Sequence, residues 1–163
     1  MSELAERLAL EFADKDYAHA YMESHRISRI AAQVYALRKQ RNWSQRQLAE
    51  HSGIAQERIS KIESADFSSL TLSTLNKLAR AFDVDLRVAF DSFGQGILDV
   101  VNLSPAGLEV LSRDDALDTL KTRRLMLDQN HEWRAVDVPK LARALPITPV
   151  APALPSGQWA RLG

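Results

Sequence analysis

The stretch WSQRQLAEHSGIAQERISKIES, residues 43–64, has the pattern of two short helices joined at a single glycine. Ser44 is a good N-cap for the first helix, and Gly53 can adopt the positive φ that a tight turn requires. In the second helix Ile59 and Ile62 stand three residues apart, which is the spacing of a buried face. The pattern therefore predicts two helices that pack against a core through one apolar side each.

The opposite side of the second helix is polar, although core packing places no demand on its chemistry. A helix that docks end-first into the DNA major groove needs hydrogen-bonding side chains on its first turn and again one turn later. Glutamine can pair with adenine, lysine with guanine, and glutamate can accept from cytosine N4. The candidate base-reading residues are Gln56, Glu57, Ser60 and Lys61.

Helical apolar spacing continues on both sides of this stretch. It predicts a short helix in residues 3–12, a long one in residues 14–41, and a further helix in residues 72–82 capped by Thr71. The long helix is expected to end near Asn42, two residues before Ser44, because asparagine tolerates the left-handed conformation in which helices often end.

Beyond residue 84 the pattern changes. Residues 85–93 alternate apolar and polar side chains and are the best strand candidate, with residues 96–103 as a possible hairpin partner. Pro105 marks a further helix start, and residues 114–129 are expected to form a helix. From about residue 131 prolines block both helix and strand bonding, so an extended, mobile tail is expected.

The quoted stretch and TLSTLNKLARAFDVDL, residues 71–86, resemble the helix-turn-helix domain of the phage repressor and Cro type, also called the XRE family. The resemblance covers residues 26–90. It implies that Gln45 touches phosphate or an outer base, that Gln56, Glu57 and Lys61 read base edges, and that Arg38 and Glu63 form a structural ion pair. Together with the basic helix end, the candidate DNA-backbone contacts are Ser44, Gln45, Arg46, Arg58, Ser64, Ser68, Arg38, Lys39 and Arg41.

Two residues depart from the family pattern. Ala55 stands where the family usually has a Ser or Thr cap, which should cost the second helix about 1 kcal/mol. Glu57 places a carboxylate beside DNA phosphates, which should weaken non-specific binding and favour a cytosine.

Charge is unevenly distributed along a chain whose net charge is zero. Residues 26–90 hold eleven Lys and Arg against six Asp and Glu, a net +5, whereas residues 1–25 carry −4 and residues 91–163 carry −1. The basic charge therefore coincides with the quoted stretch, as expected for a segment that binds nucleic acid.

Composition excludes several classes of site. The chain has no cysteine, and its four histidines show no metal-ligand spacing, so neither a metal nor another cofactor is expected. No nucleophile motif or phosphate loop is present, which argues against an enzyme. Without a signal peptide or an apolar run of roughly 18 residues, a cytoplasmic protein that does not enter the membrane is expected.

The expected fold is mainly α. A five-helix repressor/Cro-type DNA-binding domain in residues 26–84 follows an N-terminal helical extension, residues 1–25. A strand or hairpin plus a helix in residues 85–130 would dimerise through Leu86, Val88 and Phe90, and residues 131–163 would form a proline-rich flexible tail.

Two hypotheses for function remain open. The first is a repressor that binds a palindromic double-stranded operator as a homodimer and regulates its own synthesis. The alternative is an antitoxin that binds DNA through the same domain and neutralises a partner toxin through its C-terminal segment. A disordered tail with a single Trp anchor, Trp159, suits folding on binding.

Overall fold

The computed structural model describes residues 3–67, 69–121, 123–128 and 130–137, and the chain divides into two compact units, residues 1–117 and 118–163. The first unit contains α1 (Glu3–Glu11), α2 (Lys15–Gln40), α3 (Gln45–Ser52), α4 (Gln56–Glu63), α5 (Leu72–Phe82), α6 (Phe93–Val101), the 3-10 helix η1 (Ala106–Leu108) and the start of α7 (Arg113–Lys121). The second contains the end of α7 and an antiparallel hairpin, β1 (Arg123–Leu127) with β2 (Trp133–Asp137). The mainly α fold class is confirmed. Nowhere in the described residues is there a helix long and apolar enough to cross a membrane.

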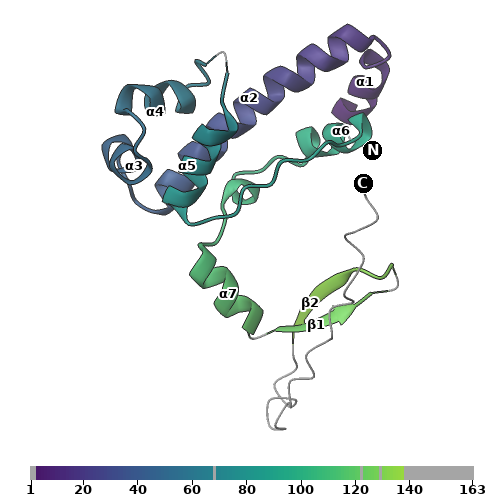
Figure 1. Ribbon diagram of the computed structural model, residues 1–163. Coiled ribbons are helices and arrows are strands. Elements are labelled where there is room, and N and C mark those ends of the chain that lie inside the picture. The colour runs from purple at the N-terminus through teal and green to yellow at the C-terminus, as the bar shows by residue number, and fades with distance from the viewer. Residues whose placement is uncertain (1–2, 68, 122, 129, 138–163) are drawn as a thin grey trace, which may run out of the picture. The chain divides into compact units, whose positions relative to one another are not determined.

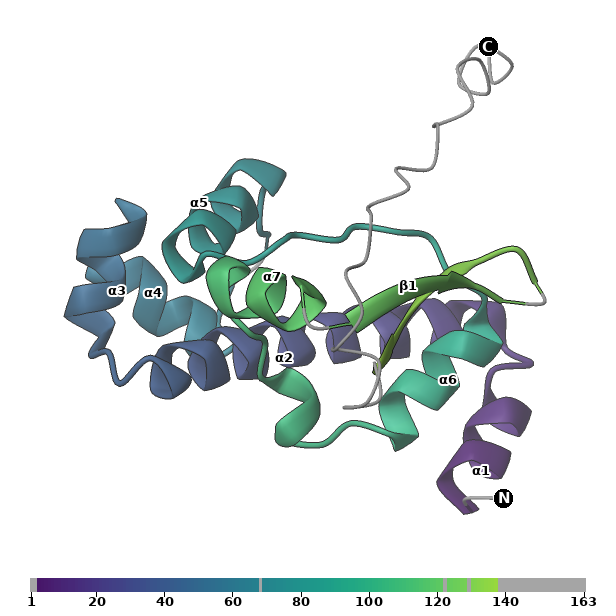
Figure 2. The same ribbon diagram turned by 90° about the horizontal axis from the view of Figure 1, so that it is seen from below.

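The long helix α2 organises the first unit. Its 26 residues correspond to a length of about 39 Å. Helices α3, α4 and α5 gather around its C-terminal half, and α1 and α6 lie at its other end (Figures 1 and 2). The helix therefore joins the segment predicted to bind DNA to the N-terminal extension.

The helix ends follow the sequence signals. Asn42 has φ of 56° and Gly53 of 64°, both left-handed. The Ser44 side chain accepts from the Gln47 N–H while the Gln47 side chain accepts from the Ser44 N–H, which completes a capping box. At α4, Ala55 provides no side-chain cap, as predicted.

The core of the helix-turn-helix segment joins all four of its helices. Eight buried apolar side chains form it: Val34, Leu37, Leu48, Ile54, Ile59, Ile62, Leu78 and Phe82. Burial of a side chain of this size contributes about 1.5–3 kcal/mol. The predicted inward face of α4 is therefore correct at Ile59 and Ile62. In α5, where Leu72, Leu75, Leu78, Ala79 and Phe82 were expected to face the core, Leu78 and Phe82 are buried but Leu72 is exposed.

A second cluster lies where α1 and α6 meet the start of α2. The Phe12 ring packs edge-to-face against Tyr21 and Phe93, with centroids 5.5 and 5.8 Å apart. An ion pair between Arg29 and Asp99, 2.9 Å long, connects α2 to α6. The N-terminal extension is thus packed against residues that follow the helix-turn-helix segment.

The predicted strand at residues 85–93 is wrong in position. Residues 84–92 have no regular secondary structure, and the expected hairpin partner falls largely in α6. Helix formation wins there because Ser92 accepts from the Gln95 N–H as an N-cap, and Phe93, Ile97 and Val100 recur at helical spacing.

The hairpin that does form lies later in the chain. The helix expected in residues 114–129 ends at Lys121, and β1 pairs with β2 so that Leu125 lies opposite Ala135. The carboxylate of Asp128 accepts from the N–H groups of Asn130 and Glu132 and so holds the turn. The tail predicted from residue 131 is therefore wrong for residues 133–137; residues 138–163 lie outside the described part. The helix start predicted at Pro105 is only the short η1.

Candidate DNA interface

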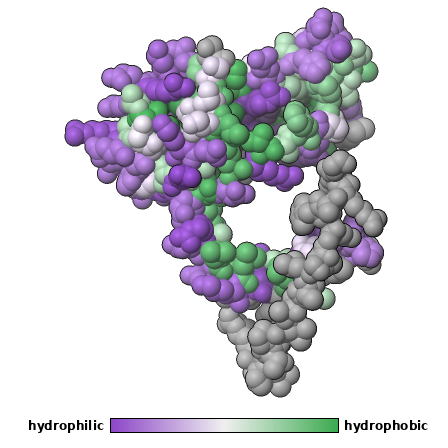
Figure 3. Space-filling view, in the orientation of Figure 1, coloured by the Kyte–Doolittle hydropathy of each residue, from purple (hydrophilic) through white to green (hydrophobic). Residues whose placement is uncertain are grey.

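Helix α4 presents two chemically different sides. Ile59 and Ile62 are 0% and 1% exposed, whereas all four candidate base-reading residues, Gln56, Glu57, Ser60 and Lys61, are exposed. Among the residues that the structure describes, none hydrogen-bonds to the side chain of Gln56, Glu57 or Lys61. Figure 3 shows that the surface over α3 and α4 is mostly polar. These side chains are thus free to bind a ligand.

The turn between α3 and α4 fixes the direction of α4. The Ser52 hydroxyl donates to the Leu48 carbonyl and accepts from the Ile54 N–H, at 2.7 and 3.3 Å. Gly53 supplies the left-handed residue, and Ile54 is buried in the core. This local network holds the first turn of α4 at the surface of the unit.

A buried ion pair locks the end of α4 to the end of α2. Arg38 Nε and Nη2 donate to the two carboxylate oxygens of Glu63 at 2.6 and 2.7 Å, and both side chains are below 10% exposed. Arg38 Nη1 also donates to the Trp43 carbonyl at 2.8 Å. The predicted ion pair is confirmed. The structure adds a third partner, because Gln45 Nε2 donates to Glu63 Oε2 at 3.0 Å.

The three cations at the end of α2 have different surroundings, although all three were expected to contact the DNA backbone. Arg38 is buried in the ion pair. Arg41 donates to the carbonyls of Leu37 and Phe82, and burial lowers the pKa of its guanidinium. Lys39 is exposed, with Nζ 5.6 Å from the centroid of the Tyr35 ring. We therefore assign both arginines to the scaffold and only Lys39 to the open surface.

The candidate contacts at the start of α3 keep donors available for phosphate. Ser44 Oγ accepts from the Gln47 N–H, so its own hydroxyl proton remains free to donate to an anion. Arg46 pairs with Glu50 at 3.1 Å, but both side chains are more than 60% exposed, so the pair is weak and easily exchanged. The amide of Gln45 is held by Glu63, which orients it.

The remaining candidates lie around the end of α4 and the loop after it. Arg58 is exposed and lines a hollow together with Lys61, Asp66 and Phe67. The Ser64 hydroxyl donates to the Ser60 carbonyl at 3.0 Å, so it must rotate before it can donate to phosphate. Ser68 lies outside the described residues.

The residues predicted to dimerise lie in an irregular segment. Val88 is 71% exposed and Phe90 is fully exposed, whereas Leu86 is half-buried. Within the described residues no strand pairs with this segment. It therefore leaves two large apolar side chains in solvent.

Comparison with known proteins identifies one segment. Residues 34–88 match the helix-turn-helix family, and no curated protein and no solved structure matches the chain significantly. The match begins inside α2 and ends after α5, so it includes the core, the turn at Gly53 and the whole of α4. The helix-turn-helix is a DNA-binding module and not an enzymatic one. Over residues 34–88 the chain therefore contains a helix-turn-helix domain of the phage repressor and Cro type, a domain of DNA-binding transcriptional regulators.

Proposed function

We propose that the protein is a sequence-specific transcriptional repressor that binds a palindromic operator as a homodimer and regulates its own synthesis. The observation that carries this proposal is the exposed side of α4. Its first turn and the next hold an amide, a carboxylate, a hydroxyl and an ammonium group on a helix whose other side is fully buried. These are the groups that distinguish base pairs in the major groove.

Each exposed residue of α4 has a distinct role in this proposal. Gln56 pairs with adenine through its amide, and Lys61 donates to guanine. Glu57 accepts from cytosine N4. Its charge is also repelled by the phosphates of any duplex, so binding is weakened wherever the cytosine contact does not offset that repulsion. Ser60 can donate to, or accept from, either kind of base edge.

The phosphate contacts surround α4 on two sides. Ser44, Gln45 and Arg46 lie at the start of α3, where the N-terminal end of the helix favours an anion. Lys39, Arg58 and Ser64 complete the set. These contacts fix the position of α4 on the duplex but carry no sequence information themselves.

Dimerisation is proposed through the irregular segment that follows α5. Val88 and Phe90 expose apolar surface that a second copy of the segment would bury by pairing across a two-fold axis. Two copies of α4 would then lie about 34 Å apart, one turn of DNA. The antitoxin alternative depends on residues 138–163, and no observation on the described residues favours it.

Selection of binding sites from randomised duplex DNA tests the proposal with the full-length protein. We expect an inverted repeat with half-sites centred about 10 base pairs apart. A matched pair of variants gives the control. Glu57→Gln should change the selected sequence, whereas Glu23→Gln, which alters an exposed carboxylate in the N-terminal half of α2, should not. Failure to enrich any sequence would refute sequence-specific binding, and enrichment of single half-sites would refute the dimer.

A further inference from the structure

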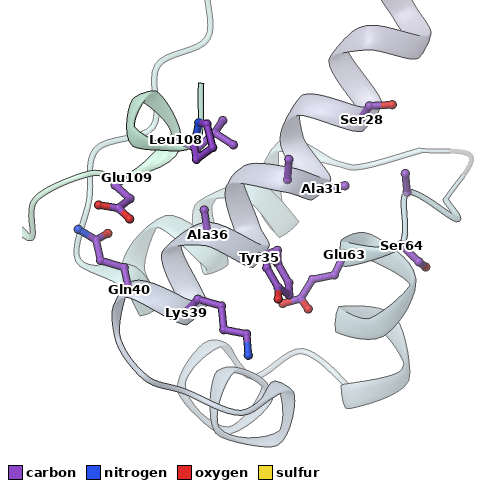
Figure 4. Close-up of a pocket in the computed structure, with 13 residues that line it drawn as sticks. Ser28, Ala31, Tyr35, Ala36, Lys39, Gln40, Glu63, Ser64, Leu108 and Glu109 are labelled. Carbon is purple, nitrogen blue, oxygen red and sulfur yellow. The ribbon is translucent and has the colours of Figure 1, made fainter. Parts of the chain in front are cut away.

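A groove runs along α2 on the side of the first unit where η1 packs (Figure 4). Its volume is about 640 Å³, which is in the range of pockets that hold small molecules. Two rows of α2 residues spaced four apart line it: Ser28, Ala32, Ala36 and Gln40 in one row, and Ala31, Tyr35 and Lys39 in the other. Because alanine and serine have short side chains, they leave open the space that larger residues would fill.

Most of the lining suits a flat apolar molecule. Pro105 and Leu108 add apolar surface on the η1 side of the groove. The side chain of Tyr35 is 48% exposed, so part of its aromatic ring is available to a ligand. A ring system placed here would bury apolar surface of its own against the alanines and could stack on, or pack edge-on against, the tyrosine.

One cation in the lining has no anion. Lys39 is exposed, and its Nζ lies 5.6 Å from the centroid of the Tyr35 ring. Among the described residues no carboxylate pairs with this ammonium group. A ligand that carries a negative charge at this end of its ring system would therefore find a partner.

The two carboxylates that line the groove do not take that role. Both oxygens of Glu63 accept from Arg38, at 2.6 and 2.7 Å, so its charge is already neutralised. Glu109 lies on the Gln40 side of the groove, away from the Lys39 ammonium (Figure 4). The charge that the groove lacks is therefore a single anion beside Lys39.

We propose that this groove binds a small aromatic carboxylate, with one or two rings along the alanines of α2 and against Tyr35. The carboxylate accepts from the Lys39 ammonium, and a hydrogen bond between two charged groups is stronger than one between neutral groups. A neutral molecule of the same shape gains the apolar contacts but not the contact with Lys39.

A ligand in this groove competes with DNA, and this part of the inference rests on the proposed function. Lys39 and Ser64, which both line the groove, belong to the proposed phosphate contacts. A carboxylate on Lys39 takes the place of a phosphate oxygen. Because binding effects are reciprocal, the ligand weakens operator binding and the operator weakens ligand binding by the same factor.

Titration of the full-length protein without DNA tests the site, with 2-naphthoate as the probe. For a ligand of this size we expect a Kd of about 1 mM or lower. Its neutral analogue 2-naphthamide, which has the same shape, should bind about tenfold or more weakly. The backbone amides whose NMR shifts respond should lie in residues 31–40, 63–65 and 105–109.

Three variants separate the contacts. Lys39→Met removes the cation and should abolish the preference for 2-naphthoate over 2-naphthamide. Lys77→Met, which alters an exposed lysine of α5 outside the groove, is the matched control and should keep that preference. Ala32→Leu fills the groove with a larger side chain and should weaken binding of both probes.

The competition is tested on the operator at constant ionic strength. Near saturation, 2-naphthoate should weaken operator binding about fivefold or more, whereas 2-naphthamide at the same concentration should not. Ala32→Leu keeps both Lys39 and Ser64, so it should bind the operator as the unsubstituted protein does but no longer respond to 2-naphthoate.

Each other outcome overturns the inference or one part of it. A Kd far above 1 mM, or equal binding of the two probes, overturns the site, as do NMR shifts confined to residues 86–90. Groove binding without any change in operator affinity overturns the competition alone, and the operator binding seen there leaves the proposed function standing. If no operator is bound, the proposed function fails, and the titration without DNA still decides the site. Circular-dichroism melts identify any variant that does not fold, and either Lys39→Met or Ala32→Leu alone completes the test.

Discussion

Replacing Gln56 with alanine should weaken binding to the selected operator and leave the fold intact. The side chain is exposed and has no hydrogen-bond partner among the described residues, so the free energy of unfolding should change by less than about 0.5 kcal/mol. A bidentate contact between an amide and adenine contributes about 1–3 kcal/mol of discrimination. A symmetric dimer makes that contact twice, so the loss on a palindrome should be about 2–6 kcal/mol.

The assay compares affinity for the operator and for a scrambled duplex at one salt concentration, alongside the melting temperature. Gln56→Ala should lower the operator affinity about 30-fold or more and leave the scrambled affinity nearly unchanged. Glu57→Ala should also lower the ratio of the two affinities, but with equal or higher affinity for scrambled DNA, because it removes repulsion from phosphate. A purely structural glutamate would not give that pattern.

Ile59→Ala provides the contrasting control. It deletes buried carbon from the core and should lower the free energy of unfolding by about 2–5 kcal/mol. It should weaken binding to both duplexes only because part of the protein is unfolded. If Gln56→Ala and Glu57→Ala both leave the operator-to-scrambled ratio unchanged, α4 does not read bases and the proposed mechanism fails.

Four further outcomes are expected. Glu63→Ala should destabilise the domain by about 3–5 kcal/mol in urea titrations, because it leaves the Arg38 charge buried without its partner; a change below about 1 kcal/mol would contradict this. The affinity of the dimer for operator should fall with salt at a log–log slope of magnitude above about 3, and a shallower slope would count against the phosphate contacts. Ala55→Ser should raise the free energy of unfolding by about 0.5–2 kcal/mol by capping α4, and no increase would mean that the cap cannot form. Burial lowers the pKa of His25 below its ordinary 6.5, so the free energy of unfolding that depends on neutral His25 is full above that pH and falls as pH drops below it. Between about pH 7.5 and about pH 5.5 the melting temperature should therefore fall less in His25→Gln than in the unsubstituted protein, and equal falls would exclude the effect.

The helix-turn-helix segment was predictable because its signals are local. Ser44 caps α3, Gly53 takes the left-handed turn, and Ile59 and Ile62 lie one turn apart, so each signal acts within a few residues of where it is read. The exposed side of α4 follows from the same periodicity. The tie between Gln45 and Glu63 was not predictable, because it joins polar residues 18 positions apart and leaves no periodic trace.

The hairpin predicted after α5 is wrong in part because one glycine of the segment, Gly96, is required by tertiary packing and not by a turn. In the sequence, GQG at residues 94–96 resembles a turn between two strands. In the structure Gly96 lies inside α6 where a Cβ would stand 2.7 Å from Cε of Met22, so the missing side chain permits close packing against α2. A packing glycine and a turn glycine look the same until the neighbouring helix is known.

Helical spacing distinguishes the three cations at the end of α2, although they lie close together in the sequence. Arg38 stands four residues after Val34, and Arg41 four after Leu37, so each continues a buried row of the helix. Lys39 belongs to neither row and is exposed. Of three cations counted toward the +5 charge of residues 26–90, two are therefore engaged within the protein, one with a carboxylate and one with helix carbonyls. In the proposed complex the long-range field would still attract DNA, and the direct phosphate contacts would come mainly from α3 and α4. Lys39→Ala should therefore reduce the salt slope by about one per protomer, and Arg38 substitutions should act through stability alone.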